Sequence, residues 1–257
     1  MLFFDNHPIV CQVFGQTIRS TFKMLILEHD AKEILHSSGV PVPRGVLAAS
    51  PGVAPPFDGP CFVKVQIPAG GRGKAGGIVR AETTAEIEAA LKRLLGTRIK
   101  GHPVRECRIE QAVGDAAEAY LSLAVDPVSG GIDVLLSATG GVEIESAAGR
   151  ESLETGRACR DPGAISATVA ALADNLPDPV RGALIDAGGR LADIFCRLET
   201  TQIEINPLLV GPNGTWIAGD AKMIADESAF VRQAVFAELV RARAGSYPEA
   251  ALKLAQD

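Results

Sequence analysis

Apolar residues recur at helical spacing in five stretches of the chain. The first begins at Glu28 and carries Ala31 and Leu35 on one face. It ends at Gly39, because glycine readily takes the positive φ of a helix C-cap. Ahead of the second stretch, Thr83-Thr84-Ala85-Glu86 has the form of a capping box. The spacing predicts helices from Glu28 to Gly39, from Thr83 to Gly96, from Asp161 to about Leu176, from Asp178 to about Leu198, and after Ser228.

Short apolar runs and alternating apolar and polar residues predict strands between these helices. Residues 126–131 are rich in turn formers, so the strands on either side are expected to form a hairpin. Pro212-Asn213-Gly214 is expected to be a second hairpin loop, three residues long. The predicted strands span residues 61–67, 77–81, 104–113, 118–125, 132–138, 201–210 and 215–222.

The composition indicates a folded protein with a substantial core. The chain has 257 residues, of which 47% are hydrophobic and 22% charged, and this size suits one domain of two lobes. Its net charge of −6 gives no general attraction to nucleic acid, so a polyanionic ligand has to be held by a local basic site. We therefore expect a small ligand and no nucleic-acid partner.

Targeting and redox signals are few. None of the apolar runs approaches the ~20 residues needed to cross a bilayer, so no membrane association is expected. The five cysteines are scattered and include no CxxC pair, which fits a reduced, cytoplasmic protein. Residues 1–23 lack the apolar core of a secretory signal, and Met24 opens directly onto a helical pattern. Residues 1–23 are therefore interpreted as an N-terminal extension, either disordered or added by a misplaced start.

The stretch from Phe62 to Gly77 contains Gly-Arg-Gly-Lys-Ala-Gly, a formal match to the dinucleotide fingerprint GxGxxG. That fingerprint leads into a helix, whereas here the glycines lead into the predicted strand 77–81. A P-loop is excluded as well, because Pro68 stands in place of its first glycine and Ala75 in place of its magnesium-binding hydroxyl. Both familiar phosphate loops are therefore rejected.

What remains is a glycine-rich flap between two antiparallel strands. Without side chains to hold the backbone away, the N–H groups of such a flap could cover a triphosphate. Lys64, on the strand that enters the flap, would be a second phosphate contact. The alternative is a flexible hairpin in which Arg72 and Lys74 are merely solvated.

A second group of polar residues is expected from the last strand pair. Residues 202–208 alternate, so Glu204 and Asn206 share one face of their strand. The three-residue loop at 212–214 places Asn206 opposite Asp220 and Glu204 opposite Lys222. The oxygens of Asn206 and Asp220 suit magnesium, which takes its other ligands from water and phosphate. The alternative is an exposed polar patch between two strands.

Glu110 ends one predicted strand and Glu118 begins the next, where a linker between lobes could meet an adenine or a ribose. The alternative is that both carboxylates are solvated. The four histidines show no metal-ligand spacing, so each is expected to be a surface or a hydrogen-bonded residue: His7, His29, His36 and His102.

Three motifs follow one another along the chain: Val63-Lys64 with Gly70–Gly77, then Gly140-Gly141-Val142-Glu143-Ile144-Glu145, then Ile203–Leu208. Together they resemble the β subunit of succinyl-CoA synthetase and the ADP-forming acyl-CoA synthetase family. Met24–Lys32 is also similar to that family's N-terminus, so the resemblance covers roughly residues 24–257. It implies an α+β fold of the ATP-grasp type, in which two lobes with antiparallel sheets clamp a magnesium nucleotide. The small lobe would span about 40–112, the large lobe about 24–39 and 113–245, and 246–257 would be a tail.

The resemblance also implies a role for each matching residue. Glu204 matches a carboxylate that orients a phosphorylated histidine delivered by an α-type subunit. ATP or GTP would phosphorylate that histidine, the phosphate would pass to a carboxylate substrate, and CoA would displace it. Phosphates would be held by Lys64, Gly71, Arg72 and Gly73, the base and ribose by Glu110, Val113 and Glu118, and magnesium by Asn206 and Asp220.

The family usually continues into a second domain that builds part of the CoA-ligase site, and this chain stops at Asp257. The leading hypothesis is therefore a nucleotide-binding subunit or fragment of an ADP-forming carboxylate–CoA ligase. It would work with an α-type subunit that carries the phosphohistidine and the CoA-binding domain, and with a separate CoA-ligase domain. A stand-alone ATP-grasp carboxylate–amine ligase and a non-catalytic nucleotide-binding module remain as alternatives.

Overall fold

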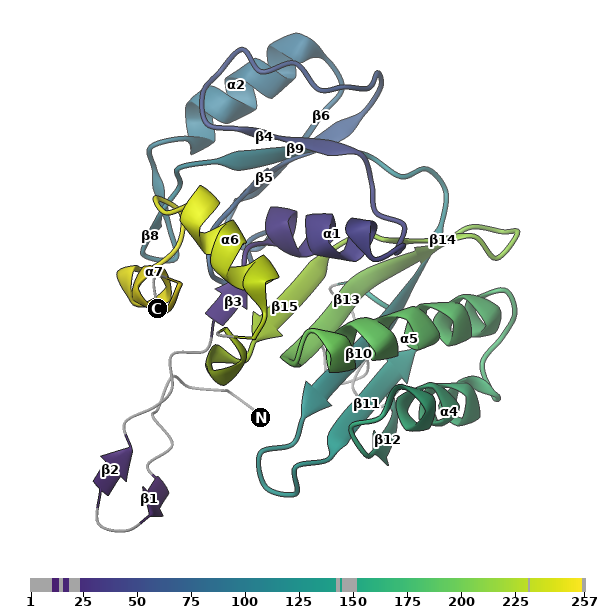
Figure 1. The fold of residues 1–257 in the computed structure, drawn as a ribbon. Coiled ribbons are helices and arrows are strands. Elements are labelled where there is room, and N and C mark those ends of the chain that lie inside the picture. Colours follow the sequence, from purple (N-terminus) through teal and green to yellow (C-terminus); the bar gives the residue numbers. More distant parts are fainter. Residues whose placement is uncertain are drawn as a thin grey trace.

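The computed structural model describes residues 11–13, 16–18, 24–141, 144, 152–230 and 232–255. Two antiparallel sheets dominate these residues, and helix α1 (Glu28–Ser37) lies between them (Figure 1). Of the N-terminal stretch, the described residues form strands β1 (Cys11–Val13) and β2 (Gln16–Ile18). These two strands pair with each other and with neither of the larger sheets.

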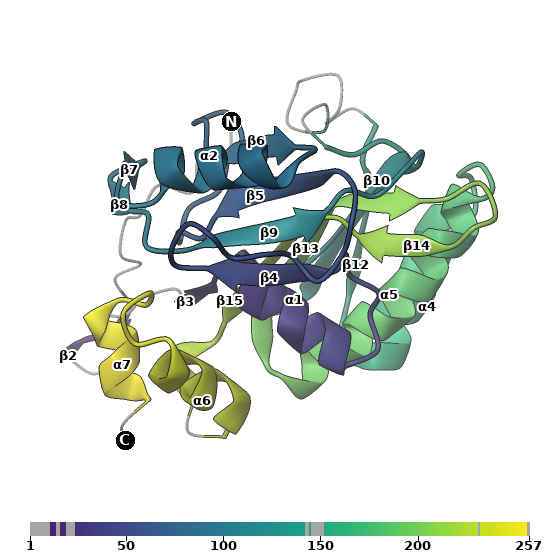
Figure 2. The same cartoon turned by 90° about the horizontal axis from the view of Figure 1, so that it is seen from above.

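The smaller sheet has four strands in the order β4-β9-β5-β6. Helix α2 (Thr84–Leu94) covers its outer face and buries Ile87 and Leu91 against it (Figure 2). The backbone N–H of Glu86 donates to the Thr83 hydroxyl at 3.2 Å, as the capping-box pattern predicts. The strands are β4 (Gly45–Ala48), β5 (Cys61–Val65), β6 (Ile78–Ala81) and β9 (Cys107–Gln111), beside a small hairpin of β7 (Arg98–Ile99) and β8 (His102–Pro103).

The larger sheet has seven strands, with the path β12-β11-β10-β13-β15-β3 and β14 paired to β13. Helices α4 (Pro162–Ala173) and α5 (Val180–Arg197) cover one face of it (Figure 1). Asp161 caps α4, as predicted, whereas Asp178 does not cap α5 and instead pairs with Arg181. The strands are β3 (Met24–Ile26), β10 (Ala117–Val125), β11 (Ile132–Ser137), β12 (Glu154–Ala158), β13 (Thr200–Val210), β14 (Trp216–Ala218) and β15 (Ala221–Ala225).

The predicted register of the last strand pair is confirmed. Glu204 lies opposite Lys222, and the backbone N–H of Asn206 donates to the carbonyl of Asp220 at 3.3 Å. The second strand, however, is divided into β14 and β15 at Gly219-Asp220. The N–H of Gly219 donates to the Pro207 carbonyl at 2.9 Å, so the pairing continues through the break. The break therefore leaves Asp220 opposite Asn206.

The prediction of a long helix after Ser228 is wrong. Glu227–Ala229 forms a single 3₁₀ turn, and α6 begins only at Ala234 and ends at Ala242. The Gln233 amide donates to the Arg197 carbonyl at 2.9 Å and to Glu199 at 3.0 Å, which ties the residue before α6 to the end of α5. Gln233, with φ of −112° and ψ of 77°, therefore lies outside the helix that follows it.

The C-terminal residues that were expected to form a tail are folded up to Ala255. Helix α7 (Glu249–Leu254) packs beside α6, and Ala251 is buried. Tyr247 is buried as well, because its hydroxyl donates to Asp30 at 2.6 Å and accepts from the N–H of Leu27 at 3.1 Å. These contacts attach the C-terminal segment to the start of α1.

Two adjacent glycines of α5 offer a matched test of its packing against α4. A Cβ on Gly188 would lie 2.5 Å from Val169 of α4, whereas a Cβ on Gly189 would meet no heavy atom within 4 Å. Gly188→Ala is expected to lower the free energy of unfolding by about 1–3 kcal/mol through overpacking. Gly189→Ala is expected to raise it by up to about 1 kcal/mol through helix propensity. Urea unfolding measures both, and shifts of the same sign would contradict this packing.

Candidate functional site

All ten predicted site residues line one cleft of about 710 Å³ between the two sheets. The flap residues and Lys64 reach it from β5 and β6, and Asn206 and Asp220 reach it from β13 and the turn before β15. Residues far apart in the chain are therefore brought together. The predicted site residues in the cleft are Lys64, Gly71, Arg72, Gly73, Glu110, Val113, Glu118, Glu204, Asn206 and Asp220.

A charge cluster, buried except for Asp220, lies at the base of the cleft. We define it as Lys32, Lys64, Arg72, Arg108, Glu28, Glu110 and Asp220, which are joined by ion pairs. Within it, the ammonium of Lys64 lies 2.6 Å from Glu110 and 3.1 Å from Glu28. Burial alone would lower the pKa of Lys64, but the carboxylates of Glu28, Glu110 and Asp220 outweigh it and raise the pKa. Lys64 therefore stays charged, as a phosphate contact requires.

The carboxylate of Glu110 lines the cleft and is buried among cations, so the alternative of a solvated carboxylate is wrong for this residue. Only 2% of the side chain is exposed, and it pairs with Lys32 and Lys64 at 2.6 Å and with Arg108 at 2.7 Å. Burial would raise the pKa of Glu110, but Lys32 and Lys64 lower it, so the group stays ionised. Three cations already occupy this carboxylate, so its contacts fit the support of Lys64 better than the binding of a ribose.

The glycine-rich flap reaches across the cleft to the larger sheet. Gly71 has φ of +65°, a conformation that glycine adopts without strain. The guanidinium of Arg72 lies 3.1 Å from both carboxylate oxygens of Asp220 and 2.7 Å from Glu28. This pairing joins the flap to the residue expected to bind magnesium, so Arg72 and a metal ion would compete for the Asp220 carboxylate.

The two residues predicted to bind magnesium supply hard oxygen atoms at adjoining positions. The side-chain oxygen of Asn206 accepts from the N–H of Gly141 at 2.6 Å, and its amide group donates to the Gly141 carbonyl at 3.3 Å. A Cβ on Gly140 would lie 2.3 Å from the Ala119 carbonyl, so the close approach of this loop requires glycine. The second motif thus orients Asn206, although its residues 142, 143 and 145 lie outside the described part.

Burial and the nearby Glu28 raise the pKa of Asp220 to about 6, against the opposing effect of Arg72. Among the described residues, no group of three or more His, Cys, Asp or Glu side chains could hold a metal ion. Two protein oxygens nevertheless fit magnesium, because this ion usually keeps several waters and binds the phosphates of its substrate. The donor set is therefore suited to a metal that arrives with a nucleotide.

Glu204 lies on the same face of β13 as Asn206, as the alternation predicts. Gln202 donates to its carboxylate at 3.0 Å, and the ammonium of Lys222 lies 3.9 Å away. The side chain is 22% exposed and lines the cleft. A carboxylate in this position can accept a hydrogen bond from a group that enters the cleft.

The charge cluster contains residues that the sequence analysis missed. Glu28 and Lys32 are one helical turn apart on α1 and lie in the same stripe as the buried Ala31 and Leu35. A charged pair within an apolar stripe is unusual, because unpaired charges are rarely buried. That pattern was the available signal for Glu28 and Lys32. For Arg108, the sequence offers no comparable signal.

His29 is a hydrogen-bonded histidine, as expected, and it makes stability depend on pH. Burial and the neighbouring Arg108 lower the pKa of His29 to about 4, below the ordinary value of 6.5. As pH falls, the imidazole takes up a proton in the unfolded chain before it does so in the folded protein. The contribution of the neutral His29 to folding stability is therefore complete above pH 6.5 and is lost as pH falls toward 4.

Between pH 7 and pH 5 the wild-type protein is therefore expected to lose about 2 kcal/mol more stability than His29→Gln. Urea unfolding at the two pH values measures the difference, and His36→Gln, at an exposed position of α1, is the control for the substitution itself. Equal losses in the wild type and His29→Gln would contradict the burial of a neutral imidazole.

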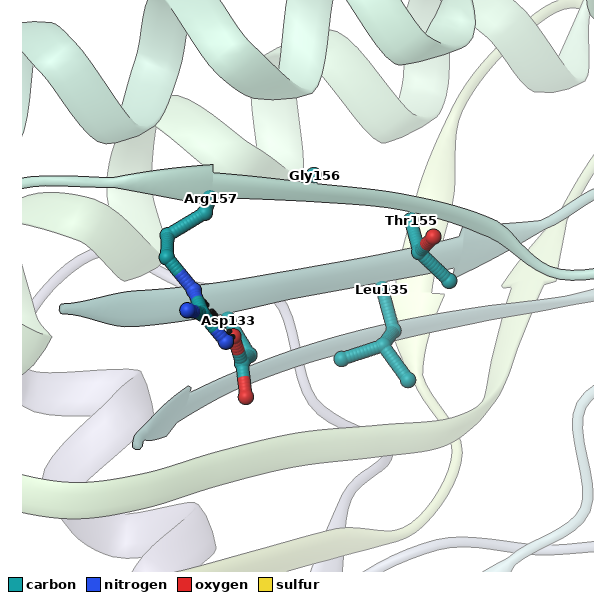
Figure 3. Close-up of a pocket in the computed structure, with 5 residues that line it drawn as sticks. All are labelled: Asp133, Leu135, Thr155, Gly156 and Arg157. Atoms are coloured by element: carbon teal, nitrogen blue, oxygen red, sulfur yellow. Dashed lines mark hydrogen bonds and ion pairs between the residues drawn. The ribbon is translucent and has the colours of Figure 1, made fainter. Parts of the chain in front are cut away.

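A second hollow, of about 440 Å³, lies over β11 and β12 on the larger sheet (Figure 3). Arg157 and Asp133 point toward one another across it, with the guanidinium 2.9 Å from the carboxylate. Gly156 also lines the hollow, and a Cβ there would lie 2.9 Å from Thr168 and 3.1 Å from Leu172 of α4. The charges in this hollow neutralise each other, so we assign no ligand to it.

Comparison with known proteins gives consistent results. The chain matches the ATP-grasp domain over residues 25–210. It is 36% identical over 224 residues to an ADP-forming succinate–CoA ligase β subunit of Halobacterium salinarum, covering 84% of this chain and 59% of that protein. It is 35% identical over 221 residues to the corresponding β subunit 2 of Streptomyces coelicolor, covering 84% of this chain and 57% of that protein. The chain thus spans less than two thirds of the length of these relatives.

Solved structures share the fold at lower identity. An ATP citrate lyase from Methanothrix soehngenii, solved with citrate and coenzyme A, aligns with a TM-score of 0.64 and 18% identity. That alignment covers 82% of this chain and 53% of the lyase. The acetyl-coenzyme A synthetase 1 of Ca. Korarchaeum cryptofilum aligns with a TM-score of 0.55 and 22% identity, covering 79% and 93% of the two chains. No helix among the described residues is long and apolar enough to cross a membrane.

Proposed function

The chain belongs to the ATP-grasp family, and from this membership we propose that it is the nucleotide-binding subunit, or a fragment of one, of an ADP-forming carboxylate–CoA ligase. The observation that carries the proposal is the cleft itself. It brings the glycine-rich flap and the buried ammonium group of Lys64 together with the oxygen atoms of Asn206 and Asp220. The relatives are named ADP-forming succinate–CoA ligase β subunits, and these names support a CoA-ligase reaction with ATP as the phosphate donor.

In the proposed reaction, Lys64 and the flap bind the phosphates of the nucleotide. Phosphoryl transfer depends mainly on positioning and on neutralising charge, so cations held in fixed places are the principal requirement. Asn206 and Asp220 would hold magnesium, which supplies positive charge to the phosphate oxygens when it is bound. Arg72 has to leave Asp220 for this to happen and is then free to contact a phosphate.

Glu204 would act on the partner's histidine. Its carboxylate, 22% exposed in the cleft, can accept a hydrogen bond from one ring N–H of an imidazole. That bond fixes the tautomer and leaves the other ring nitrogen as the nucleophile. The complete ligase would also need an α-type subunit with the phosphohistidine and CoA-binding domain and a separate CoA-ligase domain, and we propose a cytoplasmic location for it.

The experiment is phosphate transfer from γ-labelled MgATP to a purified succinate–CoA ligase α subunit, with this chain as the catalyst. Appearance of acid-labile phosphohistidine on the α subunit, dependent on both this chain and magnesium, is the expected result. Release of ADP from ATP when acids and amines are supplied without CoA or an α subunit would instead select a carboxylate–amine ligase. Tight nucleotide binding with no transfer to any of these acceptors would select a non-catalytic module.

A further inference from the structure

Two lysines of the charge cluster share the same three acceptors. The ammonium of Lys32 lies 2.8 Å from Glu28 Oε1, 2.6 Å from Glu110 Oε2 and 2.8 Å from the Gly219 carbonyl. The ammonium of Lys64 lies 3.1 Å from Glu28 Oε1, 2.6 Å from Glu110 Oε1 and 3.1 Å from the same carbonyl. An ammonium has three N–H donors, so Lys32 alone can serve all three residues.

The two lysines differ in their access to the cleft. The Lys32 side chain, from α1, is 0% exposed, and Lys32 is absent from the lining of the cleft. The Lys64 side chain, from β5, is 9% exposed and lines the cleft beside the flap. Lys32 is therefore shielded from the cleft, whereas Lys64 is accessible from it.

Moving Lys64 alone toward a phosphate would be unfavourable if nothing replaced it. Glu28 and Glu110 are both almost fully buried, and a buried carboxylate that loses its partner is strongly destabilising. Lys32 already contacts both of them at distances equal to or shorter than those of Lys64. The positive charge of Lys32 also repels Lys64 and so favours the movement of Lys64 toward the cleft.

We propose that Lys32 is a positioning residue: it keeps Glu28, Glu110 and the Gly219 carbonyl paired, so that the ammonium of Lys64 can turn to a phosphate of the bound nucleotide. This inference rests on the proposed function. Arg72 pairs with Glu28 and Arg108 with Glu110, but each contacts only one of the two carboxylates. Without Lys32, the ammonium of Lys64 is the one remaining described cation that contacts both, and it is retained by them. Nucleotide affinity then falls even though no residue that contacts the nucleotide has changed.

The test compares MgATP affinity, by calorimetry, for Lys32→Met, Lys64→Met and the double variant. Lys64→Met is expected to weaken binding about 100-fold and Lys32→Met about 10-fold, since hydrogen bonds to charged groups have this range of energies. The double variant is expected to bind within about twofold of Lys64→Met, because Lys32 acts through Lys64. Lys92→Met removes a surface partner of Glu88 and is the control for loss of a lysine charge.

Several outcomes separate this inference from the proposed function. If Lys32→Met binds MgATP as the wild type does, or if the two single effects multiply in the double variant, the positioning role is overturned. If Lys64→Met itself leaves MgATP affinity unchanged, the phosphate contact assigned to Lys64 fails, and with it the proposed nucleotide site. If Lys32 had only a structural role, Lys32→Met would weaken binding independently of Lys64. The affinity loss of the double variant would then equal the product of the two single losses.

A measurement on the wild-type protein covers the case in which Lys32→Met does not fold. Acetic anhydride labels accessible amines, and mass spectrometry locates them. Lys32 is expected to stay unlabelled with and without MgATP, because it remains paired in both states, while MgATP lowers the labelling of Lys64. Labelling of Lys32 that appears only with MgATP would show that Lys32 leaves its acceptors, and would overturn the inference.

Discussion

Asp220→Asn is expected to reduce phosphoryl transfer from MgATP by roughly 10³-fold, because it removes the carboxylate that is proposed to hold magnesium at the phosphates. Asparagine has the same shape and keeps an oxygen, so the substitution tests charge more than packing. In the free protein it also removes the ion pair in which one nitrogen of Arg72 donates to both carboxylate oxygens of Asp220. Nucleotide binding without metal is therefore expected to be unchanged or slightly stronger, whereas the gain in affinity on adding magnesium is expected to disappear.

Calorimetry with ATP in EDTA and with MgATP measures this difference in affinity, and labelled phosphate transfer measures the rate. Asp133→Asn, in the hollow of the larger sheet away from the cleft, is the control for loss of one carboxylate. An Asp220→Asn variant with wild-type dependence on magnesium would show that the metal binds elsewhere.

Lys64→Met is expected to weaken MgATP binding about 100-fold, the second-largest effect that the geometry implies. Methionine keeps most of the length of the side chain, and Lys32, Arg72 and Arg108 remain to pair with Glu28 and Glu110. The fold is therefore expected to survive, and circular dichroism checks it. Affinity within about threefold of the wild type would mean that the ammonium of Lys64 only pairs with the buried carboxylates and does not contact the nucleotide.

Much of the site follows from the sequence because it depends on local rules. The register of β13 against β14 and β15 follows from the three-residue loop at 212–214, and it places Asn206 opposite Asp220. The glycine flap follows from the failure of two other phosphate loops, since β6 and not a helix comes after it. In each case a few neighbouring residues determine the backbone conformation of the loop.

The remainder depends on contacts between distant segments. The local sequence around Glu110 indicates only a carboxylate at the end of a strand. In the structure Glu110 forms ion pairs with Lys32 of α1 and Lys64 of β5, which are distant in the chain. Strand β12 was not predicted, because Glu154–Ala158 lacks an apolar alternation and pairs only as an edge strand. The shortened helix α6 depends on the attachment of Gln233 to Glu199. None of these partners is visible within a local window of sequence.

The most direct test of the central claim is a calorimetric titration of the intact chain with MgATP. One binding site is expected, with affinity that falls on removal of magnesium and falls about 100-fold in Lys64→Met. No heat of binding at millimolar MgATP, or binding that neither magnesium nor Lys64 affects, would contradict the assignment of the cleft to a metal nucleotide.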